Sequence, residues 1–253
     1  MKTDPRILTI LTTPEGILVP MDMTKRPTSL LGVSTDAKTV KGEKKGVLTG
    51  IMYLAPHKLS GINVCPMADL AGCAAPCLNT AGRGRMTPVQ EARVRKTRFL
   101  HEDKAGFIAV LRKDIRKLVA KAKRMGMVPM VRLNGTSDIR WEVEAPELFQ
   151  EFSDVQFYDY TKIPNRKNLP DNYHLTFSYS GANDRYAAFA DVAIANGLNV
   201  AVVFRSVLPE TFLGLPVVNG DESDVRPFDP NGVVVGLTAK GSAKRDTSGF
   251  VQG

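Results

Sequence analysis

The chain has 253 residues, 43% of them hydrophobic, and a formal net charge of +8. This composition excludes an intrinsically disordered protein and provides enough apolar surface for one large domain or two small ones. The apolar run in residues 1–16 is interrupted by polar residues and Pro14, and it is too short for a secretory signal or a membrane span. We therefore expect a cytosolic protein without a membrane partner.

The first predicted region is an N-terminal arm or loop, residues 1–46. Its second half, 24–46, is rich in Lys, Thr, Gly and Ser and shows little periodicity, which is typical of a loop. A strand is predicted over 46–56, where apolar β-formers precede a proline. From residue 47 to residue 253 we expect a single α/β domain, with a cysteine-containing loop at 62–85.

Two helices are predicted after this loop. The sequence TPVQ at 87–90 has the form of a capping box with proline at the first helical position, so the first helix begins there and ends near Leu100. The second, over 104–125, repeats apolar residues at helical spacing and carries Lys and Arg on its other face. Within 83–124, fourteen Lys or Arg residues stand against four acidic ones. This basic block indicates either a nucleic-acid footprint or the solvated face of two long helices.

Short apolar runs separated by turns or helices fill the rest of the chain. They predict strands at 128–134, 155–160, 174–179, 199–204, 215–218 and 232–238. Their unbroken apolar character is typical of strands that are buried on both faces of a parallel sheet. An amphipathic segment at 183–196 adds a helix between two of these strands. The predicted fold is therefore α/β, an incomplete or open β/α barrel of about six to seven mostly parallel strands.

The three cysteines of the chain, Cys65, Cys73 and Cys77, lie within thirteen residues. In a reducing compartment such a cluster indicates a metal or catalytic site rather than disulfides. Structural zinc usually has four ligands, and the nearest candidates for a fourth are His57 and Asp69. A 4Fe–4S cluster held by three thiolates leaves one iron open to another ligand. Iron–sulfur binding, zinc binding and free thiols all remain as alternatives.

A strand, a cysteine loop, a helix and a series of β/α units follow one another in this chain. This layout resembles radical S-adenosylmethionine enzymes, and the resemblance implies a 4Fe–4S cluster and S-adenosylmethionine as cofactors. The spacing here is Cys-x7-Cys-x3-Cys, whereas that family usually has Cys-x3-Cys-x2-Cys. Pro76 also stands before the last cysteine, where that family usually has an aromatic residue.

Three stretches of the chain, KKGVLTGIMYLAP, SGINVCPMADLAGCAAPCLNTAGRG and VRLNGTSDIRW, carry a second resemblance. They are similar to the phage gene 88 product family. This resemblance implies a bacteriophage protein that acts in the cytoplasm of the bacterial host, and it implies no particular activity. It adds only that Cys65, Cys73 and Cys77 are ligands.

Polar residues follow the predicted strands, and in a β/α barrel such residues face the mouth of the active site. The candidates for binding a small molecule there are Arg132, Asn134, Asp138, Asp159, Lys162 and Arg205. Ser178, Ser180, Asp221 and Lys240 occupy similar positions. One hypothesis is an iron–sulfur enzyme of radical or redox type whose open iron faces these residues. The alternative is a phage accessory protein, stabilised by an iron–sulfur cluster or zinc, that binds nucleic acid through the basic helices at 88–124.

Overall fold

The computed structural model describes residues 9–12, 18–21, 25–34, 40 and 42–253, and the rest of the predicted arm lies outside the described residues. The strands are β1 (Thr9–Thr12), β2 (Leu18–Met21), β3 (Leu31–Val33), β4 (Val47–Met52), β5 (Val128–Arg132), β6 (Gln156–Thr161), β7 (Tyr173–Ser178), β8 (Asn199–Phe204), β9 (Thr211–Phe212), β10 (Leu215–Asn219), β11 (Val234–Thr238) and β12 (Val251–Gln252). The α-helices are α2 (Thr87–Glu102), α3 (Lys104–Met125), α4 (Trp141–Glu144), α5 (Glu147–Glu151), α6 (Asp184–Ala187) and α7 (Phe189–Ala195). The 3-10 helices are η1 (Leu78–Thr80), η2 (Gly82–Arg85), η3 (Arg226–Phe228) and η4 (Gly241–Arg245).

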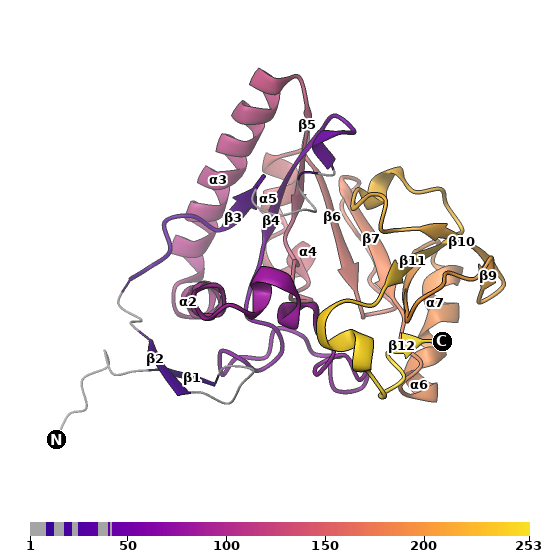
Figure 1. The fold of residues 1–253 in the computed structure, drawn as a ribbon. Helices are drawn as coiled ribbons and strands as arrows, with labels where there is room; N and C mark the ends of the chain where they lie inside the picture. Colours follow the sequence, from indigo (N-terminus) through magenta and orange to yellow (C-terminus); the bar gives the residue numbers. More distant parts are fainter. Residues whose placement is uncertain (1–8, 13–17, 22–24, 35–39, 41) are drawn as a thin grey trace.

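A ten-stranded, mostly parallel sheet forms the centre of the molecule (Figure 1). Its order is β3-β4-β5-β6-β7-β8-β11-β10-β9, and β12 pairs with β8. All seven predicted strands are present as β4 to β8, β10 and β11, and they run parallel to one another. The predicted count of six to seven was too low because β3, β9 and β12 are each only two or three residues long. Runs of this length cannot show a periodicity in the sequence.

The sheet is open, so the α/β class is confirmed, whereas no closed barrel is formed. Its edge strands β3 and β9 pair antiparallel with β4 and β10. In β8, residues 199–201 pair with β7, whereas Val203 and Phe204 pair with β12. Strand β8 therefore extends beyond the end of β7, and β12, at the end of the chain, pairs with this extension.

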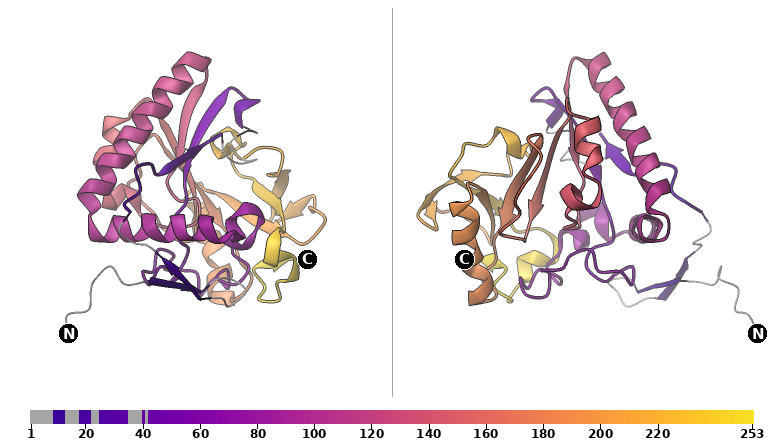
Figure 2. Two further views of the ribbon diagram at one scale, coloured as in Figure 1. Left: turned by 60° about the vertical axis from the view of Figure 1, so that its left-hand side comes forward. Right: turned by 180° about the vertical axis from the view of Figure 1, so that it is seen from behind.

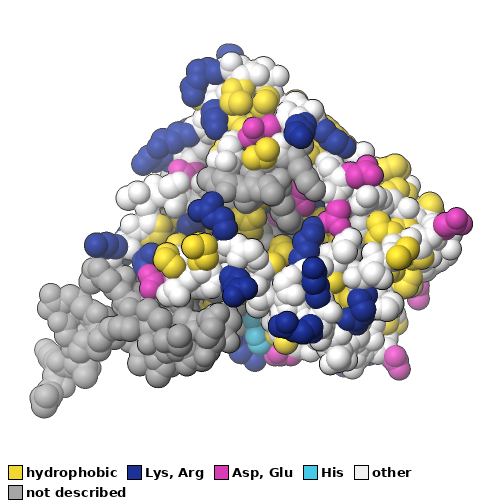
Figure 3. All heavy atoms as spheres, viewed as in Figure 1, with side chains coloured by type: hydrophobic (Ala, Val, Ile, Leu, Met, Phe, Trp, Pro, Cys, Tyr) yellow, Lys and Arg dark blue, Asp and Glu magenta, His cyan; other side chains and the backbone are white. Residues whose placement is uncertain are grey.

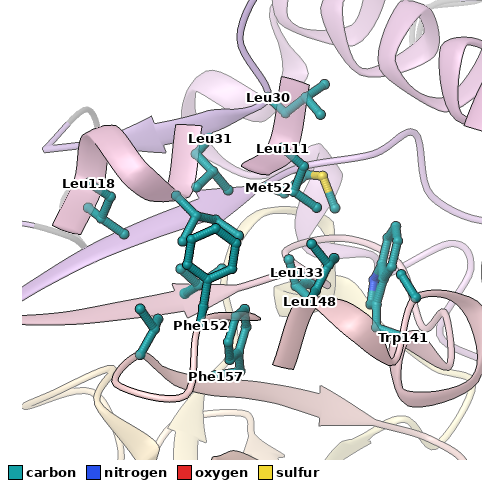
Figure 4. Close-up of a cluster of buried hydrophobic side chains, with 14 of the residues drawn as sticks. Leu30, Leu31, Met52, Leu111, Leu118, Leu133, Trp141, Leu148, Phe152 and Phe157 are labelled. Carbon is teal, nitrogen blue, oxygen red and sulfur yellow. The ribbon is translucent and has the colours of Figure 1, made fainter. Parts of the chain in front are cut away.

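Helices cover one face of the sheet, as the view from behind in Figure 2 shows. The apolar side of α3 packs on β3, β4 and β5, with Leu111 beside Met52 and Leu118 on the side of Leu31 (Figure 4). Helices α6 and α7 cover a second cluster around Phe177 and the outer side of β8. Each fully buried large apolar side chain contributes roughly 1.5–3 kcal/mol. Among the described helices, none combines the length and the apolar character needed to cross a membrane.

The opposite face of the sheet is packed by the segment that joins β10 to β11. Val225 of this segment lies in a buried cluster with Met130 and Tyr158. The neighbouring Arg226, in η3, is 1% exposed, donates hydrogen bonds to the carbonyls of Gly220 and Ser223, and forms an ion pair of 3.1 Å with Asp229. This segment fills the inner face near the start of the strands and leaves the C-terminal ends of the strands for a cavity.

Both predicted long helices are present as α2 and α3, but the capping box is not formed. Met86 is the N-cap residue of α2, and no side chain caps it. The side chain of Gln90 turns instead toward the cysteine loop, where it bonds Asn79 and Gly84. The reason is that the buried backbone and amide groups of this loop need partners, and the first turn of α2 lies beside them.

Part of the predicted arm belongs to the sheet. Strand β3 pairs with β4, and Leu30 is fully buried in the main core. The carboxylate of Asp114 on α3 accepts hydrogen bonds from the backbone N–H groups of Leu30 and Leu31. The domain boundary at residue 46 stays a prediction.

Candidate functional site

A cavity of about 320 Å³ lies at the C-terminal ends of the parallel strands. One wall is the cysteine loop, and the others are the strand ends and the segments that follow β10 and β11. The lining residues include Cys65, Met67, Cys73, Cys77, Leu78, Arg132, Asn134, Asp138, Tyr160, Lys162, Ser178, Ala201, Val203, Asp221, Asp224, Leu237, Lys240, Ala243 and Phe250. Its volume lies in the range of small-molecule sites.

The three cysteines line this cavity with partly buried side chains. The Cys65 thiol lies 3.7 Å from the carbonyl oxygen of Thr136, and the Cys73 thiol lies 3.8 Å from that of Ala68. Cys77 Sγ accepts a hydrogen bond of 3.5 Å from the N–H of Asn79. Burial raises the pKa of Cys65 to about 12 and also raises the pKa values of Cys73 and Cys77, so the thiols are protonated at neutral pH.

A metal-binding geometry is not formed by these side chains in the absence of a ligand. Within the described residues, no three His, Cys, Asp or Glu side chains are grouped closely enough to hold a metal ion. The two candidates for a fourth ligand interact with each other, since His57 Nε2 lies 3.0 Å from Asp69 Oδ1. Asp69 also accepts a hydrogen bond from Lys58, which together with His57 lowers the pKa of this carboxyl.

A buried polar network fixes the second half of the cysteine loop on α2. Asn79 Nδ2 donates a 2.9 Å hydrogen bond to Gln90 Oε1, and Gln90 Nε2 donates to the carbonyl oxygens of Asn79 and Gly84. Arg93 donates to Asn79 Oδ1, and its guanidinium lies 4.9 Å from the centre of the Tyr53 ring. Because these groups are nearly inaccessible to water, their pairing sets the position of Cys77. This role of Gln90 differs from the helix cap that the sequence predicts.

Among the cations that line the cavity, Lys162 is the best candidate for binding a ligand. Its ammonium donates a 3.0 Å hydrogen bond to the hydroxyl of Ser178 and a 3.2 Å hydrogen bond to the carbonyl oxygen of the same residue. It also lies 4.7 Å from the centre of the Phe250 ring. Burial lowers the pKa of Lys162, whereas the nearby cysteines and Asp138 act in the opposite direction.

The other cations that line the cavity are paired with carboxylates. Arg132 forms a buried ion pair of 2.6 Å with Asp224, and Lys240 pairs with Asp221. Among the described residues, no carboxylate forms an ion pair with Lys162. An anionic group that enters the cavity would therefore meet Lys162 as its least compensated cation.

Asn134 and Asp138 line the cavity and also stabilise the loop that follows β5. Asn134 Oδ1 accepts hydrogen bonds from Ser137, from the N–H of Ile139 and from Trp141. Asp138 accepts from Thr161 at 2.9 Å and from the N–H of Lys162 at 2.7 Å. Burial raises the pKa of Asp138. This loop in turn packs on the cysteine loop, since the N–H of Asp138 donates to the carbonyl of Val64.

Three predicted site residues, Asp159, Ser180 and Arg205, do not line the cavity. Ser180 is buried and donates a 2.6 Å hydrogen bond to the carbonyl oxygen of Ala71. Asp159 is fully buried on the helix side of the sheet, where it accepts hydrogen bonds from the N–H groups of Leu133 and Asn134 and from the Tyr173 hydroxyl. Successive strand residues face opposite sides of a sheet, so its neighbour Tyr160 faces the cavity instead. Arg205 donates to the carbonyl oxygens of Lys244, Asp246 and Gly253 and thereby holds the C-terminal segment.

Several Lys and Arg residues of the predicted basic helices are paired. Arg112 and Arg116 of α3 both pair with Glu151, and Lys104 pairs with Glu144. Arg93 is buried under the cysteine loop. These contacts reduce the charge that α2 and α3 offer to a nucleic acid.

The fold and the site define an α/β protein with an open parallel sheet and a cysteine-lined cavity at the C-terminal ends of its strands. Residues 29–253 match the family described as Gene product 88, and the chain belongs to this family. The resemblance to the phage gene 88 product family is thereby confirmed. Neither the curated proteins nor the solved structures contain a match to the chain.

Proposed function

We propose that the protein is an iron–sulfur enzyme of radical or redox type, in which Cys65, Cys73 and Cys77 hold a 4Fe–4S cluster. The observation that carries this proposal is that all three cysteines of the chain line one cavity together with the ammonium group of Lys162. Soft thiolate ligands select iron–sulfur clusters or zinc. The cavity lies where open α/β sheets bind their ligands, at the carboxyl ends of the strands.

The donor set fits a cluster with three cysteine ligands better than a structural zinc site. Zinc usually takes four protein ligands, and His57 and Asp69 interact with each other. Thiols must lose their protons to bind either metal. Lys162 would offset part of the negative charge that three thiolates bring to a partly buried site, because it lines the same cavity as the three cysteines.

When bound, such a cluster supplies one-electron transfer and a coordination position at the iron without a cysteine ligand. The resemblance to radical S-adenosylmethionine enzymes suggests the amino and carboxylate groups of that molecule as the ligand of this position. On the protein side, Lys162 and Ser178 would bind an acceptor group of the substrate. Val203, Leu237 and Phe250 would exclude water from the substrate and orient it.

Anaerobic purification followed by iron, sulfide and zinc analysis tests this proposal, together with absorbance and EPR spectra recorded before and after addition of S-adenosylmethionine. We expect about four irons per chain. A reduced spectrum that changes on addition would support S-adenosylmethionine as the ligand, and an unchanged spectrum would remove it. About one zinc per chain and no iron would overturn the iron–sulfur proposal.

A pair of variants separates specific ligation from general damage to the loop. Cys73→Ala should abolish the cluster absorbance, because it leaves only two thiolates. Met67→Ala changes another sulfur-containing side chain of the same cavity wall and should retain the absorbance. Unchanged iron content in Cys73→Ala would remove Cys73 from the ligand set.

A further inference from the structure

Two 3-10 helices that are far apart in the sequence lie side by side at the rim of the cavity. Thr80, at the end of η1, places its hydroxyl 2.6 Å from that of Ser242 in η4. A Cβ atom on Gly241 would lie 2.9 Å from the Cβ of Ala81, so only glycine allows this close approach. Helix η1 contacts both η2 and η4, and η2 follows directly after Ala81, so both basic segments lie beside η1 at this rim.

The rim formed by η2 and η4 is strongly basic. Arg83 and Arg85 in η2 and Lys244 and Arg245 in η4 are all exposed, and neither 3-10 helix contains an acidic residue. In the described part of the chain, Arg85, Lys244 and Arg245 form no ion pair. Figure 3 shows Lys and Arg side chains gathered over this part of the molecule. The rim therefore differs from α3, where Arg112 and Arg116 are paired with Glu151.

Helix η4 and the segments next to the rim also line the cavity. Leu78 of η1, Lys240 next to η4 and Ala243 within η4 are all cavity residues. A polymer held on the rim is thus positioned to place one of its units in the cavity. Phe250 offers an aromatic wall to such a unit. Tyr160 faces the cavity with a hydroxyl that has no hydrogen-bond partner among the described residues.

We propose that the rim residues Arg83, Arg85, Lys244 and Arg245 bind the phosphates of a single-stranded nucleic acid and that one base enters the cavity. Arginine binds phosphate oxygens with two parallel N–H donors, and cations distributed over two neighbouring helices match a repeating phosphodiester better than one isolated phosphate. A base inside a duplex cannot reach an enclosed cavity, which favours a single strand. That this base is the substrate rests on the proposed enzyme function, whereas binding to the rim does not.

The apolar side chains of this region favour a nucleic acid over an anionic membrane. Leu78, Ala243 and Phe250 line the cavity, where they can contact a base. A surface that inserts into a bilayer instead places its apolar side chains in a continuous face beside the cations. The test must therefore distinguish binding to a nucleic acid from association with anionic vesicles.

Fluorescence anisotropy with labelled single-stranded DNA and RNA of about 20 nucleotides tests the rim. Arg83→Gln/Arg85→Gln/Lys244→Gln/Arg245→Gln removes four charges from it. The matched control, Lys113→Gln/Lys117→Gln/Lys123→Gln/Arg124→Gln, removes four exposed charges from α3. Between about 50 and 200 mM salt, we expect the rim variant to reduce the salt slope of log K by about 3, and the control to change it little. A strand of abasic sites should bind about tenfold more weakly than the intact strand, because base contacts are lost.

Absence of binding at low salt would overturn the proposal, as would equal losses in the rim variant and the control. Binding to phosphatidylglycerol vesicles without competition by the oligonucleotide would assign the rim to membranes instead. Equal affinity for the abasic strand would overturn entry of a base into the cavity. The measurement is made on metal-free and metal-loaded protein. If the protein takes up no iron but still binds nucleic acid through the rim, only the enzyme proposal is overturned. If it holds a full cluster but binds no nucleic acid, only the nucleic-acid proposal is overturned.

Discussion

Lys162 and Ser178 join the C-terminal ends of two neighbouring strands, with 3.0 Å between the ammonium nitrogen and the serine hydroxyl oxygen. Lys162 follows β6 directly, and Ser178 is the last residue of β7. The pairing holds a positive charge at the end of β7, in the cavity that the three cysteines also line. A partly buried cation without a carboxylate partner costs folding free energy, which is typical of a functional site.

Lys162→Met should raise the free energy of unfolding of the metal-free protein by about 1–2 kcal/mol, because it removes a desolvated charge and keeps a side chain of similar length. The same variant should bind less iron, because the positive charge that offsets three thiolates is lost. Urea unfolding and iron analysis measure the two effects. Lys240→Met, at an exposed lysine paired with Asp221, serves as the control and should change neither by much. A destabilised Lys162→Met protein with full iron content would contradict the prediction.

Asp159→Asn should change how stability depends on pH. Burial raises the pKa of Asp159 to about 6 from its ordinary value of 3.8, so between these values the folded protein binds more protons than the unfolded chain. Its contribution to stability is therefore complete below pH 3.8 and is lost as the pH rises through 6. Between pH 3.8 and 6, the free energy of unfolding of the wild-type protein should fall by about 1–3 kcal/mol relative to that of Asp159→Asn. Denaturant titrations measure this effect. If the difference in unfolding free energy between the wild-type protein and Asp159→Asn stays constant from pH 4 to pH 7, the raised pKa of Asp159 is refuted.

The sequence alone was sufficient to predict the strands that are buried on both faces and the two long helices. Those strands are continuous apolar runs, and α3 has a regular apolar side. Strand β12 could not be predicted, because it is only two residues long and its pairing with β8, beyond the end of β7, joins segments that are distant in the chain. Gln90 was misassigned for a similar reason, since its preference for a buried loop over a helix cap is a tertiary effect.

The rule that polar residues at strand ends face the site placed Arg132, Asn134, Asp138 and Lys162, and all four line the cavity. It failed for Asp159, because the rule fixes the end of the sheet but not the face toward which a side chain points. The cavity residues Tyr160, Asp224 and Phe250 had no pattern of their own in the sequence. For Tyr160, the alternation along β6 could have identified the inward face once the side of the helices was known.

Gln90→Ala should destabilise the protein by about 1–3 kcal/mol, because it removes the partners of Asn79 Nδ2 and of the Gly84 carbonyl in a buried place. The cysteine loop should also become more mobile, so iron uptake should fall although no ligand has been changed. Thermal unfolding and iron analysis check both results. Glu91→Ala removes the next side chain of α2, which pairs with Arg95 on the surface, and should cost less than about 0.5 kcal/mol. Equal effects of the two variants would show that Gln90 does not anchor the loop.

Arg205→Ala should loosen the C-terminal segment. The guanidinium donates three hydrogen bonds, of 2.7, 3.1 and 2.9 Å, to the carbonyl oxygens of Gly253, Lys244 and Asp246. Because Arg205 is exposed, we expect a loss of only about 1–2 kcal/mol in global stability. Amide hydrogen exchange at Val251 and Gln252 should nevertheless become faster, since β12 is a two-residue strand and the variant loses the side chain that connects Gly253 to Lys244 and Asp246. The exposed Arg185 provides the matched control, and Arg185→Ala should leave these amides unchanged. Unaltered exchange in Arg205→Ala would mean that pairing with β8 alone holds the end of the chain beside the cavity.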